Sequence, residues 1–196
     1  MAVPQSLEQE PAMLKKFLIV ILLLLAAPFM VALFIKSDYE VSVSRTIDRP
    51  LDEVFGYLRL LKHQDEFSVW AKMDPNMQQH FTGIDGEPGF VSAWESSNPD
   101  VGKGEQEIIA IVPGKRIDYA LRFIEPFTSN DSAYLITEPI EDGSTLVTWG
   151  FVGHMSYPMN LLIPLMDVES LILKDLDTGL ANLKQILERQ ATPQPE

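Results

Sequence analysis

The stretch "IPLMDVESLILKDLDTGLANLKQILE" at residues 163–188 decides the fold. Its large apolar residues recur at spacings of three, four and seven, which predicts one apolar face on a helix of more than about five turns. The residues on that face are Leu165, Ile172, Leu176, Leu180, Leu183 and Leu187. Pro164 is expected to kink this segment or to start its main helix. Gly179 lies inside the apolar pattern, where it predicts a close approach of the helix to a sheet.

Strands precede this helix. Turn signals separate six segments with alternating or β-branched character, namely "QQHFTGI" at 78–84, "FVSAWESS" at 90–97, "EQEIIAIV" at 105–112, "IDYALRFIE" at 117–125, "SAYLITEPI" at 132–140 and "TLVTWGFVGHM" at 145–155. A seventh, "YEVSVSRTI" at 39–47, comes first and is followed by a short helix or helix pair over 48–67. Because the connections are mostly short, we expect antiparallel neighbours. The sequence therefore predicts an α+β fold with a seven-stranded antiparallel sheet and a long C-terminal helix.

Gly102-Lys103-Gly104 has the composition of a phosphate-binding loop but not its pattern. The spacing of the glycines is wrong, no Ser or Thr follows the lysine, and a strand follows where a helix is needed. The two glycines instead predict a hairpin or a bulge.

Composition excludes several classes of function. The net charge is −13 and no basic stripe is present, which argues against nucleic acid as a partner. The absence of cysteine excludes thiol catalysis, disulfides and cysteine-bound zinc. The histidines, His63, His80 and His154, are far apart and follow no metal-binding motif. We therefore expect no metal and no cofactor, and favour a protein that is not an enzyme.

An apolar segment near the start, "FLIVILLLLAAPFMVALFI" at 17–35, contains no charged residue and is flanked by lysines. As a helix it would be roughly 28 Å long, close to the thickness of a bilayer core. A cleaved signal peptide is the alternative, but no small-x-small cleavage site follows. We favour an uncleaved signal anchor that spans the membrane once at 17–35.

The predicted organisation has four parts. Residues 1–13 and 190–196 are Pro- and Gln-rich tails that we expect to be disordered, 14–36 form the anchor, and 37–189 form the ligand-binding domain. Residues 1–36 carry +1, so the remainder carries −13 − 1 = −14. Lysines and arginines lie on both sides of the span and give no clear orientation. A short inside tail would place the domain on the periplasmic side of a bacterial-type inner membrane.

The order of these elements resembles the START-like (SRPBCC) superfamily, close to its polyketide cyclase/dehydrase and lipid transport branch. The segments that carry the resemblance are "RTIDRPLDEVFGYL" at 45–58, "FSVWAKMDPNM" at 67–77, "AWESSNPDVGKGEQEI" at 93–108, "LRFIEPF" at 121–127, "VTWGFVG" at 147–153 and "DLDTGLANLKQILE" at 175–188. It covers about residues 39–189. The resemblance implies a helix-grip fold, in which a curved sheet wraps round the last helix and leaves an apolar cavity between them.

Alternation and the resemblance together nominate residues for the lining of such a cavity. They are large apolar side chains on the inner strand faces, on the last helix and near element ends: Trp70, Met73, Trp94, Tyr119, Phe123, Trp149, Phe151, Leu165 and Ile172. Filling of a solid core is the alternative for each of them. Met77, Met155, Met159 and Met166 would add flexible apolar surface.

Three functions stay open from the sequence. The first is membrane-tethered binding of a hydrophobic small molecule or lipid. The second is a cyclase- or dehydratase-type enzyme that uses a cavity carboxylate; the carboxylates nearest the family-like segments are Asp74, Glu95, Glu105 and Glu107. The third is an acidic module that recruits a basic protein partner of unknown identity. Residues 158–166, "PMNLLIPLM", either start the core helix or form a gate that dips toward the bilayer.

Overall fold

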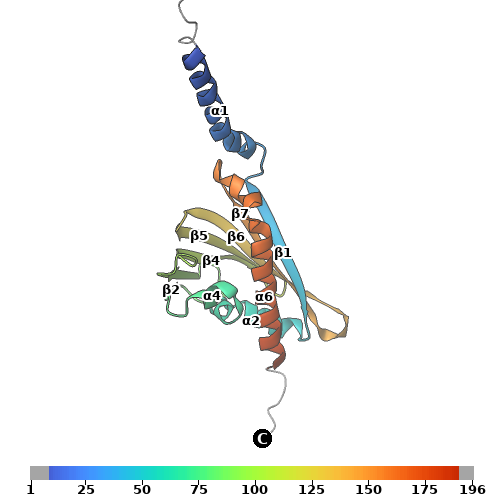
Figure 1. Cartoon of the computed structure of the whole chain (residues 1–196). Helices are drawn as coiled ribbons and strands as arrows, with labels where there is room; N and C mark the ends of the chain where they lie inside the picture. The colour runs from blue at the N-terminus through green and yellow to red at the C-terminus, as the bar shows by residue number, and fades with distance from the viewer. Residues whose placement is uncertain (1–8, 190–196) are drawn as a thin grey trace, which may run out of the picture.

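The computed structural model describes residues 9–189, in which one long helix stands apart from an α+β domain (Figure 1). The strands are β1 (Asp38–Ile47), β2 (Gln78–Thr82), β3 (Val91–Glu95), β4 (Lys103–Val112), β5 (Arg116–Glu125), β6 (Ser129–Pro139) and β7 (Thr145–His154). The helices are α1 (Gln9–Ala32), α2 (Leu51–Leu58), α3 (Gln64–Phe67), α4 (Val69–Met73), α5 (Leu162–Leu165) and α6 (Val168–Arg189). Three-residue 3-10 helices are η2 (Leu61–His63), η3 (Glu141–Gly143) and η4 (Met159–Leu161).

All seven strands form one antiparallel sheet in the order β1-β7-β6-β5-β4-β3-β2. Register shifts interrupt the β4–β5 ladder at Lys103/Gly104 and at Ile108/Ala110. Such irregularities increase the local twist and bend of a strand. The predicted α+β, helix-grip-like fold with seven antiparallel strands is therefore confirmed.

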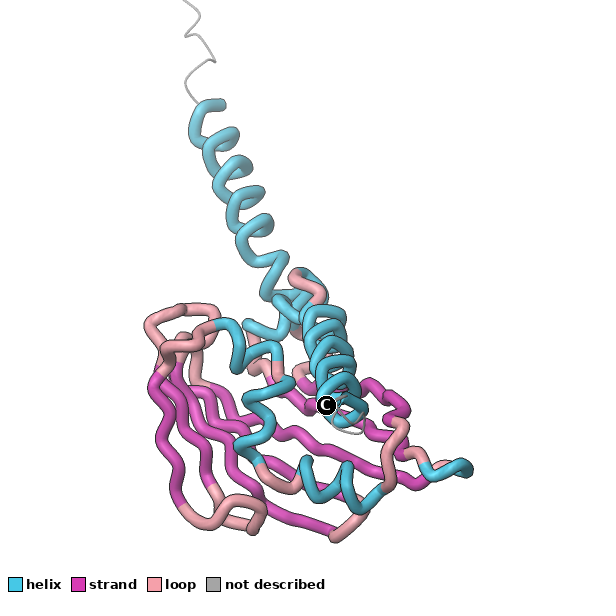
Figure 2. The backbone as a smooth tube through the Cα atoms, turned by 90° about the horizontal axis from the view of Figure 1, so that it is seen from below, coloured by secondary structure: helices cyan, strands magenta, loops and turns pink. Residues whose placement is uncertain are grey.

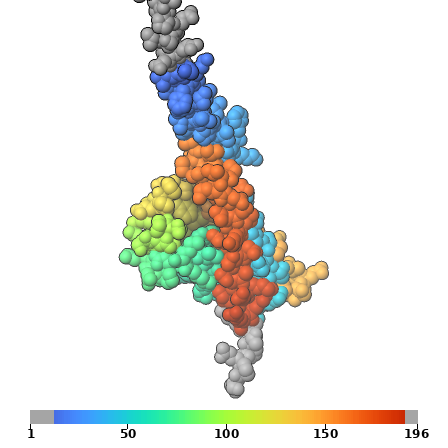
Figure 3. Space-filling view, viewed as in Figure 1, coloured from blue at the N-terminus to red at the C-terminus, as the bar shows by residue number. Residues whose placement is uncertain are grey.

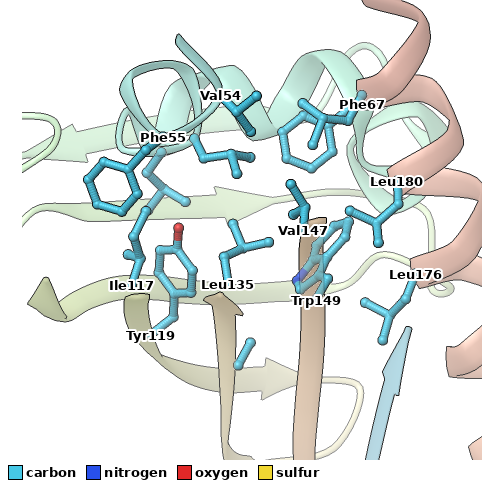
Figure 4. Close-up of a cluster of buried hydrophobic side chains, with 14 of the residues drawn as sticks. Val54, Phe55, Phe67, Ile117, Tyr119, Leu135, Val147, Trp149, Leu176 and Leu180 are labelled. Carbon is cyan, nitrogen blue, oxygen red and sulfur yellow. The ribbon is translucent and has the colours of Figure 1, made fainter. Parts of the chain in front are cut away.

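Helix α6 lies across the concave face of the curved sheet (Figure 2). Its buried side chains, Leu176, Leu180, Leu183 and Leu187, are members of the predicted apolar face. They pack with the inward residues of the strands, such as Val147 and Trp149, into one core (Figure 4). Phe67 of α3 closes this core from the side, with its ring 5.4 Å from that of Trp149 in an edge-to-face arrangement.

The prediction of the apolar face of the last helix is wrong for its first residue, Leu165. The helical conformation is interrupted between α5 and α6, where Asp167 has a φ of 50°. Pro164 lies in the short α5, one turn before the break, so the main helix begins only at Val168. Leu165 therefore lies off the α6 face and is 73% exposed.

Helix α1 contains a stretch, Met13–Ala32, that is long and apolar enough to cross a membrane, with a mean hydropathy of 2.3. Its side chains from Met13 to Val31 are almost all exposed. The helix begins at Gln9, inside the segment that the sequence predicted to be a disordered tail. The rest of that tail, and residues 190–196, lie outside the described residues.

The end of α1 is attached to the connection between β7 and α6. The Asn160 side chain of η4, which is 2% exposed, donates from Nδ2 to the carbonyl oxygens of Ala32 and Ile35, both at 2.8 Å. These carbonyls lie at the helix end, where intrahelical donors run out. The space-filling view shows this connection, in orange, against the blue end of α1 (Figure 3).

Candidate ligand-binding cavity

A cavity of about 970 Å³ lies between the concave face of the sheet, helix α6 and the segment that contains α3 and α4. Pockets that hold small molecules generally measure roughly 300–1,000 Å³. The strands contribute alternate residues to its wall, such as Leu121 and Phe123 of β5 and Trp149 and Phe151 of β7. Helix α6 contributes Val168, Ile172 and Leu176 from one face. The wall is therefore mainly apolar.

The three tryptophans of the chain, Trp70, Trp94 and Trp149, all line this cavity. The rings of Trp70 and Trp149 meet edge to face with centroids 6.1 Å apart. Trp94 packs edge to face on Phe123 at 5.9 Å and donates from Nε1 to the carbonyl oxygen of Val101 at 3.2 Å. These contacts hold the three rings in place at the cavity wall.

Gly104 explains the position of Trp94. A Cβ added to Gly104 would lie 2.6 Å from Cζ2 of the Trp94 ring, so only glycine lets the indole lie on the β4 backbone. Gly102 has a φ of +62°, which glycine adopts at little cost. The two glycines thus build the β3–β4 hairpin, as predicted, and also shape the cavity wall.

The structure brings six of the nine nominated residues to the cavity and leaves three elsewhere. The six that line it are Trp70, Trp94, Phe123, Trp149, Phe151 and Ile172. Tyr119 is on the predicted face of β5 but lies in the closed end of the barrel-like sheet, 1% exposed, where the α2 segment fills the space. Met73 ends α4 and is 41% exposed. Leu165 is turned outward by the break before α6.

The sequence identified methionines as additional apolar surface, but it missed other wall residues. Four of the five methionines that it noted, Met77, Met155, Met159 and Met166, line the cavity. Tyr39, Leu61, Phe127 and Tyr157 also line it, but they lie at element ends and in loops, where no periodicity marks an inward side chain.

One carboxylate, Asp65 of α3, lies on the cavity wall beside other polar groups. Its Oδ2 accepts a hydrogen bond from Nε2 of Gln79 at 2.9 Å. Desolvation by burial raises the pKa of Asp65, and the Gln79 hydrogen bond opposes that shift. Gln64, Ser68 and Ser92 line the same region, and Gln64 accepts a hydrogen bond from Gln106 at 3.0 Å. No sequence pattern indicates this group, because its members come from separate elements.

The four carboxylates that the sequence nominated lie away from the cavity. Glu105 and Glu107 share one face, as their spacing predicts, and both pair with Arg122 on the outer side of the sheet. Glu95 pairs with Lys103 at 2.8 Å. Asp74 accepts hydrogen bonds from the Ser96 hydroxyl and the Asn76 amide. None of the four is among the cavity-lining residues of the described chain.

The cavity opens at one end of the sheet, where the ends of several strands and the loops that join them lie together. Register places the start of β1 beside the end of β7 through the pair Asp38 and His154, and the end of β5 beside the start of β6 through Phe123 and Ser129. The loops of this end, 96–102, 126–128 and 155–158, contribute lining residues. Several of these are also well exposed, such as Phe127 at 71%. We call this end of the sheet, with its loops and the adjoining segment 158–166, the mouth.

The three histidines lie apart from one another, each with its own surroundings. His63 stacks on Tyr57 with centroids 4.3 Å apart, and His80 is exposed on β2. His154 lies at the mouth, where its Nδ1 is 2.6 Å from Oδ1 of Asp38. Within residues 9–189, no three His, Asp or Glu side chains are grouped as metal ligands would be.

A curved antiparallel sheet that grips a C-terminal helix over an apolar cavity defines the START-like class of ligand-binding domain. The chain belongs to the polyketide cyclase / dehydrase and lipid transport family, whose model matches residues 38–188. That description associates the family with hydrophobic ligands. The match begins after α1, so it covers the domain and leaves the N-terminal helix outside.

Solved structures support the fold. A protein from Mesorhizobium loti has a TM-score of 0.58 at 16% identity, covering 79% of this chain and 100% of that one. A protein from Thermus thermophilus has a TM-score of 0.55 at 14% identity, with coverage of 79% and 100%. An uncharacterised protein from Rhizobium leguminosarum has a TM-score of 0.53 at 20% identity, with coverage of 78% and 95%. No curated protein matches the chain.

Proposed function

We propose that this protein binds a hydrophobic small molecule or lipid in the cavity while α1 holds the domain at a membrane. One observation carries the proposal: the mouth of the cavity and the end of the apolar helix lie at the same edge of the domain. Asn160 joins the two, because it binds the carbonyls of Ala32 and Ile35 while its neighbour Met159 lines the cavity. A ligand could therefore pass between bilayer and cavity over a short path, and tethering raises its effective concentration.

The mouth has the surface that such a path requires. Phe127, Tyr157, Met159 and Met166 line the cavity and are 71%, 49%, 45% and 56% exposed. Large exposed apolar side chains around an opening are typical of ligand-entry and membrane-contact surfaces. In this proposal residues 14–36 are the anchor and 37–189 the binding domain, and 158–166 belong to the mouth.

A matched pair of variants in α6 tests the binding function. Ile172→Phe puts a larger side chain into the cavity, whereas Leu171→Phe puts the same side chain on a neighbouring residue that is 54% exposed and outside the lining. The full chain is purified gently and its apolar ligands are extracted and quantified by mass spectrometry. We expect Ile172→Phe to lower the bound compound several-fold and Leu171→Phe to leave it unchanged. Equal amounts in all three proteins would contradict the proposal.

The orientation of the anchor has its own test. We propose a single-pass signal anchor in a bacterial-type inner membrane with the domain on the periplasmic side. The chain has no cysteine, so Glu138→Cys introduces one thiol at an exposed site on β6. Labelling of spheroplasts by a membrane-impermeant maleimide supports this side. Labelling only after lysis would place the domain in the cytoplasm.

A second candidate function rests on Asp65. A carboxylate with a raised pKa on the wall of an apolar cavity can act as a general base. The compound extracted from the purified chain is returned to the wild type and to Asp65→Asn, and its mass is followed. A change of mass that needs Asp65 supports an enzyme of the cyclase or dehydratase type. An unchanged compound in the wild type supports binding alone.

A further inference from the structure

The charged side chains that line the cavity are nearly all acidic. They are Asp65, Asp100, Glu125 and Asp131, with His154 as the one basic residue. Within the described chain, no lysine and no arginine line the cavity. This is unexpected for a site that binds phospholipids or fatty acids, because a phospholipid head group contains a negatively charged phosphate and an ionised fatty acid ends in a carboxylate.

Three of the four Lys and Arg residues in the strands are held on the outer face of the sheet. Lys103 pairs with Glu95, Arg116 pairs with Asp118 at 2.7 Å, and Arg122 pairs with Glu105 and Glu107. Alternation along β5 sets this, since Arg116 and Arg122 have the opposite parity to the inward residues Leu121 and Phe123. These cations cannot reach a ligand inside the cavity.

One arginine does lie on the inner face of β1. Arg45 shares that face with the buried Val41 and Ile47, but it binds Asp177 of α6 at 2.6 Å. This pair lies beyond the closed side of the cavity and neither residue lines it. Arg45 is therefore both paired with an acid and out of reach.

Two further sources of positive charge are also offset. His154 at the mouth lies 2.6 Å from the Asp38 carboxylate, so any charge it gains has a partner. The N-terminal end of α6 carries the positive end of the helix dipole, and Glu169 lies in that first turn. An incoming anion would meet a negative side chain at each of these places.

We infer that the cavity takes amphiphiles whose head group bears no negative charge, and that it rejects carboxylate- and phosphate-headed lipids. An anion that enters an apolar cavity loses its hydration, and it is accommodated only where a cation or several donors replace the water. Here it would instead face carboxylates, which adds repulsion to the lost hydration. This inference rests on the proposed binding function and names the ligand class for it.

The polar region around Asp65 suits an uncharged head group. Gln64, Ser68, Gln79 and Ser92 offer both donors and acceptors on one part of the wall. A hydroxyl or amide can donate to the Asp65 carboxylate and accept from a neighbouring amide or hydroxyl. A carboxylate ligand has no proton to donate to Asp65.

The position of the tryptophans supplies the assay. All three line the cavity and none lies in α1, so their fluorescence reports a guest in the cavity. The full chain is placed in phosphatidylcholine nanodiscs and titrated with ω-bromododecanol or with ω-bromododecanoate. Bromine quenches tryptophan only at close range, and the two probes differ only in the head group. At about pH 9 the carboxyl of the acid is ionised.

We expect the alcohol to quench at concentrations at least about tenfold lower than the acid, which corresponds to the repulsion from one nearby carboxylate. Asp65→Asn removes that charge. We expect this variant to lower the concentration of acid needed for quenching several-fold and to change the concentration of alcohol little. Glu138→Gln removes the same charge from an exposed site on β6 that does not line the cavity, and is expected to change neither probe.

The outcomes separate the two proposals. Equal quenching by both probes, or stronger quenching by the acid, overturns the inference but leaves the binding function standing. Quenching by neither probe removes the binding function itself, and the inference with it. An alcohol preference that Glu138→Gln abolishes as fully as Asp65→Asn would show a general charge effect and would overturn the role of the cavity wall.

Discussion

The Trp149 ring lies directly against the backbone of Gly179, so the indole is the only side chain between β7 and α6 at this point. A Cβ built on Gly179 would be 2.6 Å from Cζ3 of the indole, closer than real contacts allow. Trp149 is 2% exposed and also lines the cavity. The helix position that sets the grip therefore also sets one wall of the binding space.

Substitution of this glycine should destabilise the domain. Gly179→Ala gains about 1 kcal/mol of helix propensity, but it forces Trp149 or α6 to move, at a cost of typically 1–3 kcal/mol. We expect a net loss in the free energy of unfolding, measured by chemical denaturation. Gly56→Ala in α2 is the matched control, because a Cβ there meets nothing within 4 Å and should stabilise. A stabilising Gly179→Ala would show that the close approach is absent.

Asn160 should control how firmly α1 is joined to the mouth. Asn160→Leu keeps the size of the side chain but removes the donors to Ala32 and Ile35, each worth about 1 kcal/mol. We expect trypsin to cleave after the exposed Lys36 several-fold faster in this variant, as followed by gel. Asn182→Leu removes a comparable bond, to the carbonyl of Phe67 at 3.0 Å, and should leave that cleavage rate unchanged.

Stability near Asp65 should depend on pH in a defined direction. Because burial raises the pKa of Asp65, the folded state holds a proton on this carboxyl more tightly than the unfolded state does. The free energy of unfolding therefore falls as the pH rises from the pKa of Asp65 in the unfolded chain to its higher pKa in the folded protein. Asp65→Asn should therefore raise the Tm at pH 7 relative to the wild type. The gain should vanish below about pH 4, where the carboxyl is protonated in both states.

Gln79 provides the complementary variant. The Gln79 amide donates a hydrogen bond to the Asp65 carboxylate and so partly offsets the rise in pKa that burial causes. Gln79→Leu removes this bond and leaves the ionised form of Asp65 less stabilised. We expect a loss of Tm at pH 7 that shrinks as the pH falls toward 4 and that disappears in the background of Asp65→Asn. A loss that persists in that background would mean that Gln79 acts through packing.

The face of each strand residue could be predicted because alternation is a local property. Ile117, Tyr119 and Leu121 are buried on one face of β5, as their spacing indicates. Alternation does not tell which residues of the inward face pack into the core and which line the cavity. Tyr119 and Phe123 share that face, yet Tyr119 fills the core and Phe123 lines the cavity, because the α2 side chains pack into the core with Tyr119 and leave the space beside Phe123 open.

The sequence by itself determined the seven strands, the closing helix, the apolar segment that stands apart, and the absence of a phosphate loop. Each follows from periodicity or composition within a few turns of chain, where backbone geometry imposes the pattern. Only the tertiary structure decided that Asp65 faces the cavity, that the cations of the sheet are paired with acids and none lies at the cavity wall, and that Asn160 binds the end of α1. These depend on which side chains of separate elements meet, as Asn160 and Ala32 do across 128 residues of chain, and no local period records such a meeting.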